Sequence, residues 1–292
     1  MTATLVSAWT AARKRLEAVG VESPAIDARL LLEAAAEVGR VDILNDPKRA
    51  LSAEQAERLE GFVRRREGRE PVSQIIGRRA FWTLNLKVTA DVLTPRPETE
   101  RLLDVALAMV PADRPFRALD LGVGSGAILL ALLAERPLAS GVGVEISEAA
   151  LEVARDNAAE LGLESRADLR LGDWTEGLAD AEFDLVLANP PYIPTAEIET
   201  LEPEVREHEP RLALDGGPDG LDAYRRLAPE ILRVLKPGGF FAVEIGIGQG
   251  AAVEALFAAA GADQLARHPD LSRRDRIVAG AKKALGNPQV NR

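Results

Sequence analysis

A glycine-rich loop between a buried strand and an apolar helix sets the strongest limit on how this chain can fold. Residues 117–121 form a short apolar run, and residues 127–135 have the composition of a helix. The loop between them consists of Gly122, Val123, Gly124, Ser125 and Gly126. Glycines allow a tight turn and a close approach of the backbone to a ligand. The stretch therefore predicts the first strand, loop and helix of a βαβ series.

Strands and helices continue to alternate after this loop. Apolar runs predict strands over 141–146, 167–171, 183–188 and 240–245, and helical patterns predict helices over 148–161, 221–235 and 249–260. Residues 264–268 and 276–279 are expected to close the sheet as an antiparallel pair. The pattern predicts an α/β fold with a Rossmann-like, seven-stranded sheet.

The N-terminal part has a different pattern. Residues 1–70 predict a small helical bundle, with a capping box at Ser52 and Gln55 before its third helix. Residues 71–93 alternate in polarity and are rich in β-forming residues, which predicts a β-hairpin linker. The catalytic domain is expected over 94–281, and a flexible tail over 282–292. From its residues alone, the bundle is as consistent with a packing accessory as with a surface that recognises a partner.

Acidic residues follow two of the expected strands. Glu145 lies about 20 positions after the glycine loop, where a carboxylate can bind both hydroxyls of an adenosine ribose. Asp173 can accept a hydrogen bond from an adenine amino group, and the indole of Trp174 can cover the ring. A loop acid beside a structural tryptophan is the alternative. With Ala127, the loop also fits the dinucleotide fingerprint, so it does not distinguish between cofactors.

A stiff polar turn follows the strand over 183–188. Its four residues are Asn189, Pro190, Pro191 and Tyr192. The prolines fix two φ angles, and the carboxyl end of a strand is where ligands bind in open α/β sheets. The Asn189 side-chain oxygen and the Pro190 carbonyl can accept both hydrogens of a planar NH₂ group, and Tyr192 can pack against a flat π system. The turn therefore favours alkylation of a planar nitrogen, with a plain proline turn as the alternative.

Composition narrows the possible functions. The chain has no cysteine and only two histidines, His208 and His268, which excludes disulfides, cysteine-based metal sites and centres that need three histidines; no metal is expected. It has no long apolar run and no signal-peptide pattern at the N-terminus, so a cytoplasmic enzyme is expected. The first 80 residues carry a net charge of +2 and the remainder −12. A catalytic domain with this negative charge is a poor candidate for binding duplex DNA through its phosphates.

The order of these motifs resembles that of the class I S-adenosylmethionine-dependent methyltransferases that act on planar amino nitrogens. Further stretches look like signatures of the release-factor glutamine methyltransferases, namely 92–100, 209–210, 213–221, 224–225, 270–271 and 274–276. The similarity covers nearly the whole chain. Thr94 stands where that family usually has an aliphatic residue, and Glu145 where it usually has aspartate.

The resemblance implies N5-methylation of the glutamine in the Gly-Gly-Gln loop of class 1 peptide chain release factors, with S-adenosylmethionine as the methyl donor. It implies that the glycine loop passes under the methionine part of the cofactor, that Glu145 holds the ribose, and that Asp173 and Trp174 hold the adenine. Asn189 and the Pro190 carbonyl would orient the glutamine amide, with Pro191 and Tyr192 beside it. The helical bundle would dock the release factor, and the enzyme is expected to be a monomer.

Three other readings remain. Adenine also presents a planar NH₂ group, so a DNA adenine-N6 methyltransferase is the nearest alternative, although no basic target-recognition segment is evident. An NAD-binding oxidoreductase would leave the turn after residue 188 without a role. A non-catalytic binding module could keep the same fold.

Overall fold

The computed structural model describes residues 3–270 and 272–284. Contacts divide the chain into two compact units, one of Met1–Arg78 with Glu202–His208 and one of Arg79–Leu201 with Glu209–Arg292. Most of the tail expected over 282–292 lies outside the described residues. Its first residue does not belong to a tail, because Lys282 ends the last strand of the sheet.

The first unit is helical, as predicted. Its helices are α1 (Leu5–Ala18), α2 (Pro24–Ala36), α3 (Arg40–Asn45), α4 (Ala53–Glu67), α5 (Val72–Ile76) and α9 (Pro203–Arg206). The capping box before α4 is present: the Gln55 amide N–H donates to the Ser52 hydroxyl, and the Ser52 amide N–H donates to the Gln55 side chain. Leucines and alanines of α1 and α2 supply most of the apolar core of this unit. The short helices α3, α5 and α9 were not predicted.

A two-stranded sheet follows the bundle. Strands β1 (Arg78–Phe81) and β2 (Leu84–Lys87) pair with each other. Trp82, at the turn between them, has a φ of 54°. The predicted hairpin is therefore confirmed.

The second unit contains a seven-stranded sheet in the order β5-β4-β3-β6-β7-β9-β8. Its strands are β3 (Arg117–Leu121), β4 (Ser140–Glu145), β5 (Ala167–Leu171), β6 (Phe183–Ala188), β7 (Leu235–Glu244), β8 (Ala262–Pro269) and β9 (Asp275–Lys282). Strands β3 to β7 pair in parallel, and β9 pairs antiparallel with both β7 and β8. The strand order reverses beside β3, which is where ligands bind in open α/β sheets.

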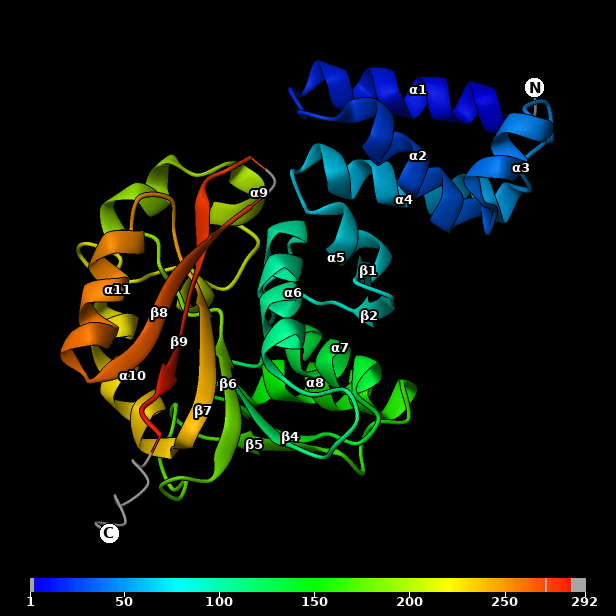
Figure 1. The fold of residues 1–292 in the computed structure, drawn as a ribbon. Coiled ribbons are helices and arrows are strands. Elements are labelled where there is room, and N and C mark those ends of the chain that lie inside the picture. Colours follow the sequence, from blue (N-terminus) through cyan, green and yellow to red (C-terminus); the bar gives the residue numbers. More distant parts are fainter. Residues whose placement is uncertain (1–2, 271, 285–292) are drawn as a thin grey trace, which may run out of the picture. The chain divides into compact units, whose positions relative to one another are not determined.

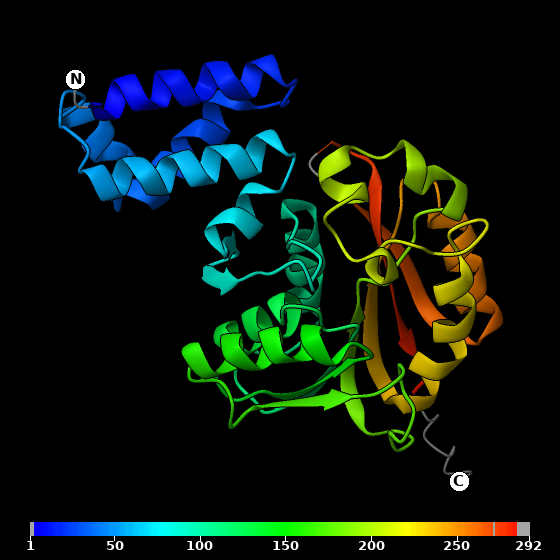
Figure 2. The ribbon, with the colours of Figure 1, turned by 180° about the vertical axis from the view of Figure 1, so that it is seen from behind.

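Helices cover both faces of this sheet (Figures 1 and 2). They are α6 (Glu100–Met109), α7 (Ala127–Glu135) and α8 (Glu148–Glu160) on one face, and α10 (Asp222–Val234) and α11 (Gly250–Ala259) on the other. Side chains alternate between the two cores, since Ala118 packs with the first group and Leu119 with the second. The predicted α/β sheet with helices on both faces is confirmed.

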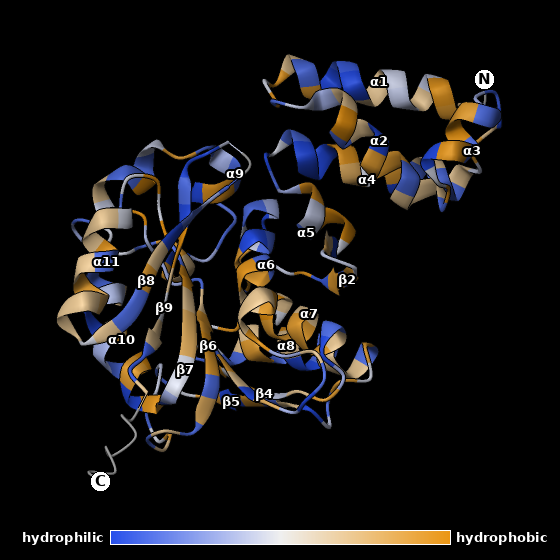
Figure 3. Ribbon diagram, viewed as in Figure 1, coloured by the Kyte–Doolittle hydropathy of each residue, from blue (hydrophilic) through white to orange (hydrophobic). Residues whose placement is uncertain are grey.

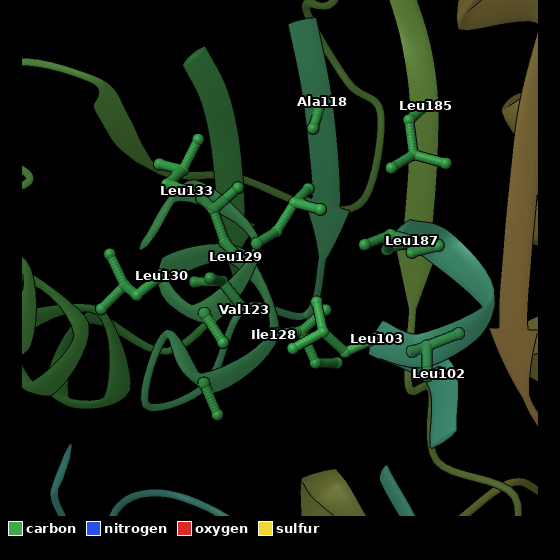
Figure 4. Packing of buried hydrophobic residues seen from close by; sticks show 14 of the residues in the cluster. Leu102, Leu103, Ala118, Val123, Ile128, Leu129, Leu130, Leu133, Leu185 and Leu187 are labelled. Carbon is green, nitrogen blue, oxygen red and sulfur yellow. The ribbon is translucent and has the colours of Figure 1, made fainter. Parts of the chain in front are cut away.

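Helix α7 is the most deeply packed element near the glycine loop. Seven of its residues, Ala127 to Leu133, are buried, and Figure 3 draws most of the helix in the hydrophobic colours. Figure 4 shows Ile128 and Leu129 within a cluster that also includes Leu187 of β6. Gly141 of β4 permits this close approach, because a Cβ on it would lie 2.5 Å from Leu129 Cδ1.

Two predicted segments differ from the structure. The loop predicted over 193–218 contains three short helices, η2 (Thr195–Thr200), α9 and η3 (Arg211–Ala213). A further short helix, η1 (Pro97–Thr99), lies outside this loop and precedes α6. The strand predicted from residue 240 begins at Leu235, and its pairing with β6 shifts register between Phe183 and Leu185. Residues 236–239 lie within this strand, between its two registers with β6. No helix among the described residues is long and apolar enough to span a bilayer.

Candidate active site

The glycine loop has the backbone conformation that requires glycine. Gly122, Gly124 and Gly126 have φ values of 73°, 53° and 84°, in the left-handed region that side chains disfavour. A Cβ on Gly126 would lie only 2.7 Å from Leu130 Cδ1. The amides of Gly122 and Val123 both donate to the Val144 carbonyl, which ties the loop to the end of β4. The loop is therefore a fixed concave strip of backbone.

Glu145 ends β4 directly beside this loop and is 8% exposed. Its Oε2 accepts a 2.9 Å hydrogen bond from the Gly124 amide. Its Oε1 accepts from the amides of Ile146 and Ser147 at 3.0 and 3.1 Å. Three backbone donors thus fix the carboxylate, and Oε2, which accepts only one of them, keeps capacity for a further donor such as a hydroxyl.

Asp173 and Trp174 lie after β5 on the far side of the loop. A Cβ on Gly122 would lie 3.5 Å from Cζ3 of Trp174, so the indole lies against the loop backbone. Both oxygens of Asp173 accept from Arg226 Nη1, at 3.0 and 2.8 Å. This arginine comes from α10 and was not predicted as part of the site. Trp174 itself has a φ of 53°, an uncommon conformation for a bulky residue.

A cavity of about 450 Å³ connects these groups. This volume lies in the range of small-molecule sites. Nine predicted site residues line it: Gly122, Val123, Gly124, Ser125, Glu145, Asp173, Trp174, Asn189 and Pro191. The structure does not bring Gly126, Pro190 or Tyr192 to its wall. Gly126 instead caps α7, and Pro190 is buried.

Asn189 lines the cavity with a defined orientation. Its Nδ2 donates to the hydroxyl oxygen of Thr99 at 3.3 Å, and Thr99 is 4% exposed. Because the amide nitrogen is engaged, the oxygen Oδ1 is the group left to accept hydrogen bonds. Thr99, at the end of η1, lies 90 residues away in sequence and was not predicted.

Tyr192 lines a second cavity of about 370 Å³ rather than the first. Its hydroxyl donates to Glu244 Oε1 at 3.3 Å. Burial, and then the charge of Glu244, raise the pKa of Tyr192, so the phenol remains protonated at neutral pH. Arg96 lines both cavities and pairs with the buried Glu209 at 2.6 Å. Glu244 and Arg96 were not named as site residues on the basis of the sequence.

Glycines of the segment after η3 allow that segment to pack closely against the backbone of the turn at 189–192. A Cβ on Gly216 would lie 2.8 Å from the Tyr192 Cα, and one on Gly220 would lie 2.3 Å from the Tyr192 carbonyl oxygen. Gln249 Nε2 donates to that same carbonyl at 2.9 Å. The glycines at 216 and 220 were noted in the sequence only as part of a family signature, and the structure gives their physical reason.

The chain is similar to several known proteins. Residues 7–77 match the PrmC N-terminal domain, and residues 113–267 match a methyltransferase domain. The release factor glutamine methyltransferase of Caulobacter vibrioides is 62% identical over 288 residues, which cover 99% of this chain and all of that protein. The protein of the same name from Rhodospirillum rubrum is 46% identical over 272 residues, which cover 93% of this chain and 83% of that protein. An RNA methyltransferase from Salinibacter ruber, solved with S-adenosyl-L-homocysteine, is 22% identical with a TM-score of 0.43, covering 69% of this chain and all of that one.

Proposed function

The chain belongs to the release factor glutamine methyltransferases, and on this premise we propose that it transfers a methyl group from S-adenosylmethionine to the side-chain amide nitrogen of a release-factor glutamine. The observation that carries the proposal is the orientation of Asn189. Its amide nitrogen is engaged by Thr99, so its oxygen is left for an NH₂ group in the cavity that the glycine loop also lines. A plain proline turn would not need this arrangement.

The residues of the cavity fit S-adenosylmethionine. Gly122 and Gly124 offer backbone without side chains, as a bulky cofactor passing over the loop needs. The fixed carboxylate of Glu145 suits ribose hydroxyls, and the indole of Trp174 suits the face of an adenine ring. Arg226 fixes Asp173 through one hydrogen bond to each of its oxygens, and each oxygen keeps a lone pair that can accept from the adenine amino group.

The cofactor supplies an activated methyl group on a sulfonium. The task of the protein is to make an amide nitrogen, whose lone pair is delocalised, act as the acceptor. Asn189 Oδ1 would accept one hydrogen of the glutamine NH₂ group and stabilise the positive charge that grows on nitrogen. The Pro190 carbonyl was expected to accept the other hydrogen, but Pro190 is buried and does not line the cavity. Neither histidine of the chain lines the cavity, so positioning supplies most of the catalysis and the proton leaves to solvent.

The target is the N5 nitrogen in the Gly-Gly-Gln loop of class 1 release factors, and the bundle over 1–70 docks that protein. The linker over 71–93 joins it to the catalytic domain over 94–281, and the enzyme works as a cytoplasmic monomer. The exposed apolar side chains Val41 and Leu44 of α3 support a docking role for the bundle.

One experiment tests the proposal against methylation of DNA adenine. The enzyme is incubated with methyl-labelled S-adenosylmethionine and either a class 1 release factor or double-stranded DNA. Label on the release factor is expected, with a 14 Da increase on the tryptic peptide that contains the glutamine. Label on DNA alone would overturn the assignment. The net charge of −12 outside the first 80 residues disfavours the DNA outcome.

A further inference from the structure

The second cavity, of about 370 Å³, is lined by three arginines from separate segments. They are Arg79 of β1, Arg96 before η1 and Arg276 of β9. Arg96 and Arg276 lie in stretches that the sequence marked as family signatures, where neither received a role. The remaining lining residues are Pro97, Glu98, Tyr192 and Glu244. A cavity with so polar a lining suits a polar ligand.

This cavity lies within reach of a substrate that is bound in the first one. Arg96 lines both cavities. Asn189 lines the first and Tyr192 the second, and because they are three residues apart in the chain, their Cα atoms are at most about 11 Å apart. An extended peptide advances about 3.3–3.6 Å per residue. The residues next to an acceptor glutamine at Asn189 can therefore reach the second cavity.

The three guanidinium groups are held in place and still keep hydrogen-bond donors. Arg79 Nε and Arg276 Nη1 donate to main-chain carbonyl oxygens at 3.2 and 3.4 Å. Arg96 Nη2 donates to Glu209 Oε2 at 2.6 Å. A guanidinium carries five N–H donors, so each of these side chains keeps donors for a ligand.

Carboxylates balance the positive charge of the arginines. Arg96 pairs with Glu209, and Arg276 Nε lies 3.6 Å from Asp270 Oδ2. Glu98 adds a third carboxylate, in the wall of the cavity itself. An anion such as phosphate would meet little net positive charge here and would lie beside the Glu98 carboxylate. The lining therefore favours a neutral ligand that both accepts and donates hydrogen bonds.

A peptide main chain has these properties, since each residue other than proline carries one C=O acceptor and one N–H donor. The carbonyls can accept from the guanidinium groups, and an N–H group can donate to Glu98. We infer that the second cavity binds the main-chain peptide groups of the two glycines that precede the acceptor glutamine. Glycines suit the cavity because they bring no side chain into it. The inference rests on the proposed function, which supplies the Gly-Gly-Gln sequence of the substrate.

The test measures methylation of a class 1 release factor by the wild type, Arg79→Met and Glu98→Ala. We expect Arg79→Met to raise the KM for the release factor about tenfold, as the loss of a hydrogen bond from a charged donor does, with kcat within about threefold of the wild type. Glu98→Ala should raise the KM about threefold. If the cavity binds an anionic group instead, removing this carboxylate would lower the KM, and that result would overturn the inference.

Arg101→Met is the matched control. Arg101 Nε also donates to a main-chain carbonyl at 3.2 Å, but Arg101 lines neither cavity, so the KM should not change. The affinity for S-adenosylhomocysteine and the melting temperature should stay near wild-type values in all three variants, because neither Arg79 nor Glu98 lines the first cavity. An unchanged KM in Arg79→Met, or equal increases in Arg79→Met and Arg101→Met, would overturn the inference.

A change in the substrate gives an independent readout. A release factor with alanine in place of the glycine directly before the glutamine would bring a methyl group into the cavity. Its KM with the wild type should rise, and the rise should be smaller with Arg79→Met, because groups in contact do not contribute additively. Equal KM values for the glycine and alanine substrates would contradict the inference. If the wild type methylates no release factor at all, the proposed function fails instead.

Discussion

At the scale of single residues, the orientation of Asn189 decides what the cavity can bind. Asn189 lines the cavity, and because its nitrogen donates to a buried hydroxyl its oxygen is the group left to accept. Under the proposed function, replacing Asn189 by alanine removes an acceptor for the glutamine NH₂ group. We expect kcat to fall at least about a hundredfold, as the loss of a charge-stabilising group in an active site does.

The measurement is single-turnover methylation of the release factor, with calorimetric binding of S-adenosylhomocysteine as a check on the fold. The affinity for that ligand and the melting temperature should change little, since Asn189 is only partly buried. A variant that turns over at nearly the wild-type rate would exclude Asn189 from the mechanism.

Asp120 gives a prediction about pH. It is fully buried beneath the glycine loop, and burial raises its pKa from 3.8 to about 8. The folded protein therefore keeps a proton that the unfolded chain loses, and the free energy of unfolding falls as pH rises between about 4 and 8. Asp120→Asn removes this dependence. Its stability relative to the wild type should grow by about 1.4 kcal/mol per pH unit in that window.

Denaturant unfolding of both proteins at several pH values between about 5 and 8 measures this difference. Using the difference cancels the other titrating groups, which the two proteins share. A constant difference across this range would mean that Asp120 is ionised in the folded state.

The sequence located the parts of the site that depend on the backbone. Glu145 and the glycines at 122 and 124 follow strand ends, and the alternating pattern fixes those ends. The side chains that orient the site could not be located in this way. Thr99, Arg226 and Glu244 come from three separate elements, and only the packing of η1, α10 and β7 brings them to their partners. For the same reason Tyr192 was expected beside the substrate but lies against the second cavity.

At the scale of elements, the fold was predictable wherever a segment is apolar over its full length. The expected bounds of β6 and α7 agree with the structure, because these buried elements leave nearly continuous apolar runs. The bounds of β3 and β5 also agree, although β3 contains two charged residues and β5 alternates between apolar and charged residues. The start of β7 was not predictable. Lys236 Nζ pairs with Asp184 at 2.8 Å across the register shift, and this contact keeps a glycine-containing stretch within the strand.

The segment that holds the Asn-Pro-Pro-Tyr turn gives a prediction at this scale. Gly220 and Gly162 both have positive φ values, 74° and 67°, but only Gly220 is crowded. Gly220→Ala would push its Cβ against the Tyr192 carbonyl and displace the turn, so we expect a large loss of kcat together with lower stability. Gly162→Ala meets no atom within 4 Å and should cost only the left-handed backbone penalty of about 1 kcal/mol.

Activity and melting temperature of the two variants check this expectation. Because both substitutions carry similar backbone strain, their difference isolates the close contacts at Gly220, which involve the Tyr192 carbonyl and Gln249 Nε2. Equal effects on kcat would show that the close contact at Gly220 has no influence on the site.

At the scale of the whole molecule, the two units are not two consecutive stretches of chain. Residues 202–208, from the long loop after β6, belong to the helical unit. Within that unit the buried Arg66 pairs with Asp27 and with Glu204, both at 2.7 Å. The loop that begins at the catalytic turn is therefore anchored in the unit proposed to dock the release factor.

Breaking that anchor gives a prediction at this scale. Arg66→Met removes the ion-pair partner of the partly buried Asp27 and leaves Glu204 paired only with Arg69, which should destabilise the helical unit by about 3 kcal/mol. Arg64→Met is the matched control on the same helix, since Arg64 is 72% exposed and pairs only with Glu60 among the described residues. It should change stability by less than about 0.5 kcal/mol.

Hydrogen exchange checks the expectation segment by segment. Amides of 202–208 should exchange faster in Arg66→Met than in Arg64→Met, and the KM for the release factor should rise only in the former. Unchanged protection of 202–208 in both variants would show that the segment does not depend on Arg66.

The position of Trp174 against the glycine loop has a practical consequence. Among the three tryptophans of the chain, only Trp174 lines the 450 Å³ cavity; the indole N–H of Trp9 donates to Ala25, and that of Trp82 to Glu135. An adenine ring stacked on that indole would quench its fluorescence. If Trp174 binds the adenine as proposed, its fluorescence would report cofactor binding, and a titration in a Trp9→Phe, Trp82→Phe background would follow that binding without a label or a methyl acceptor.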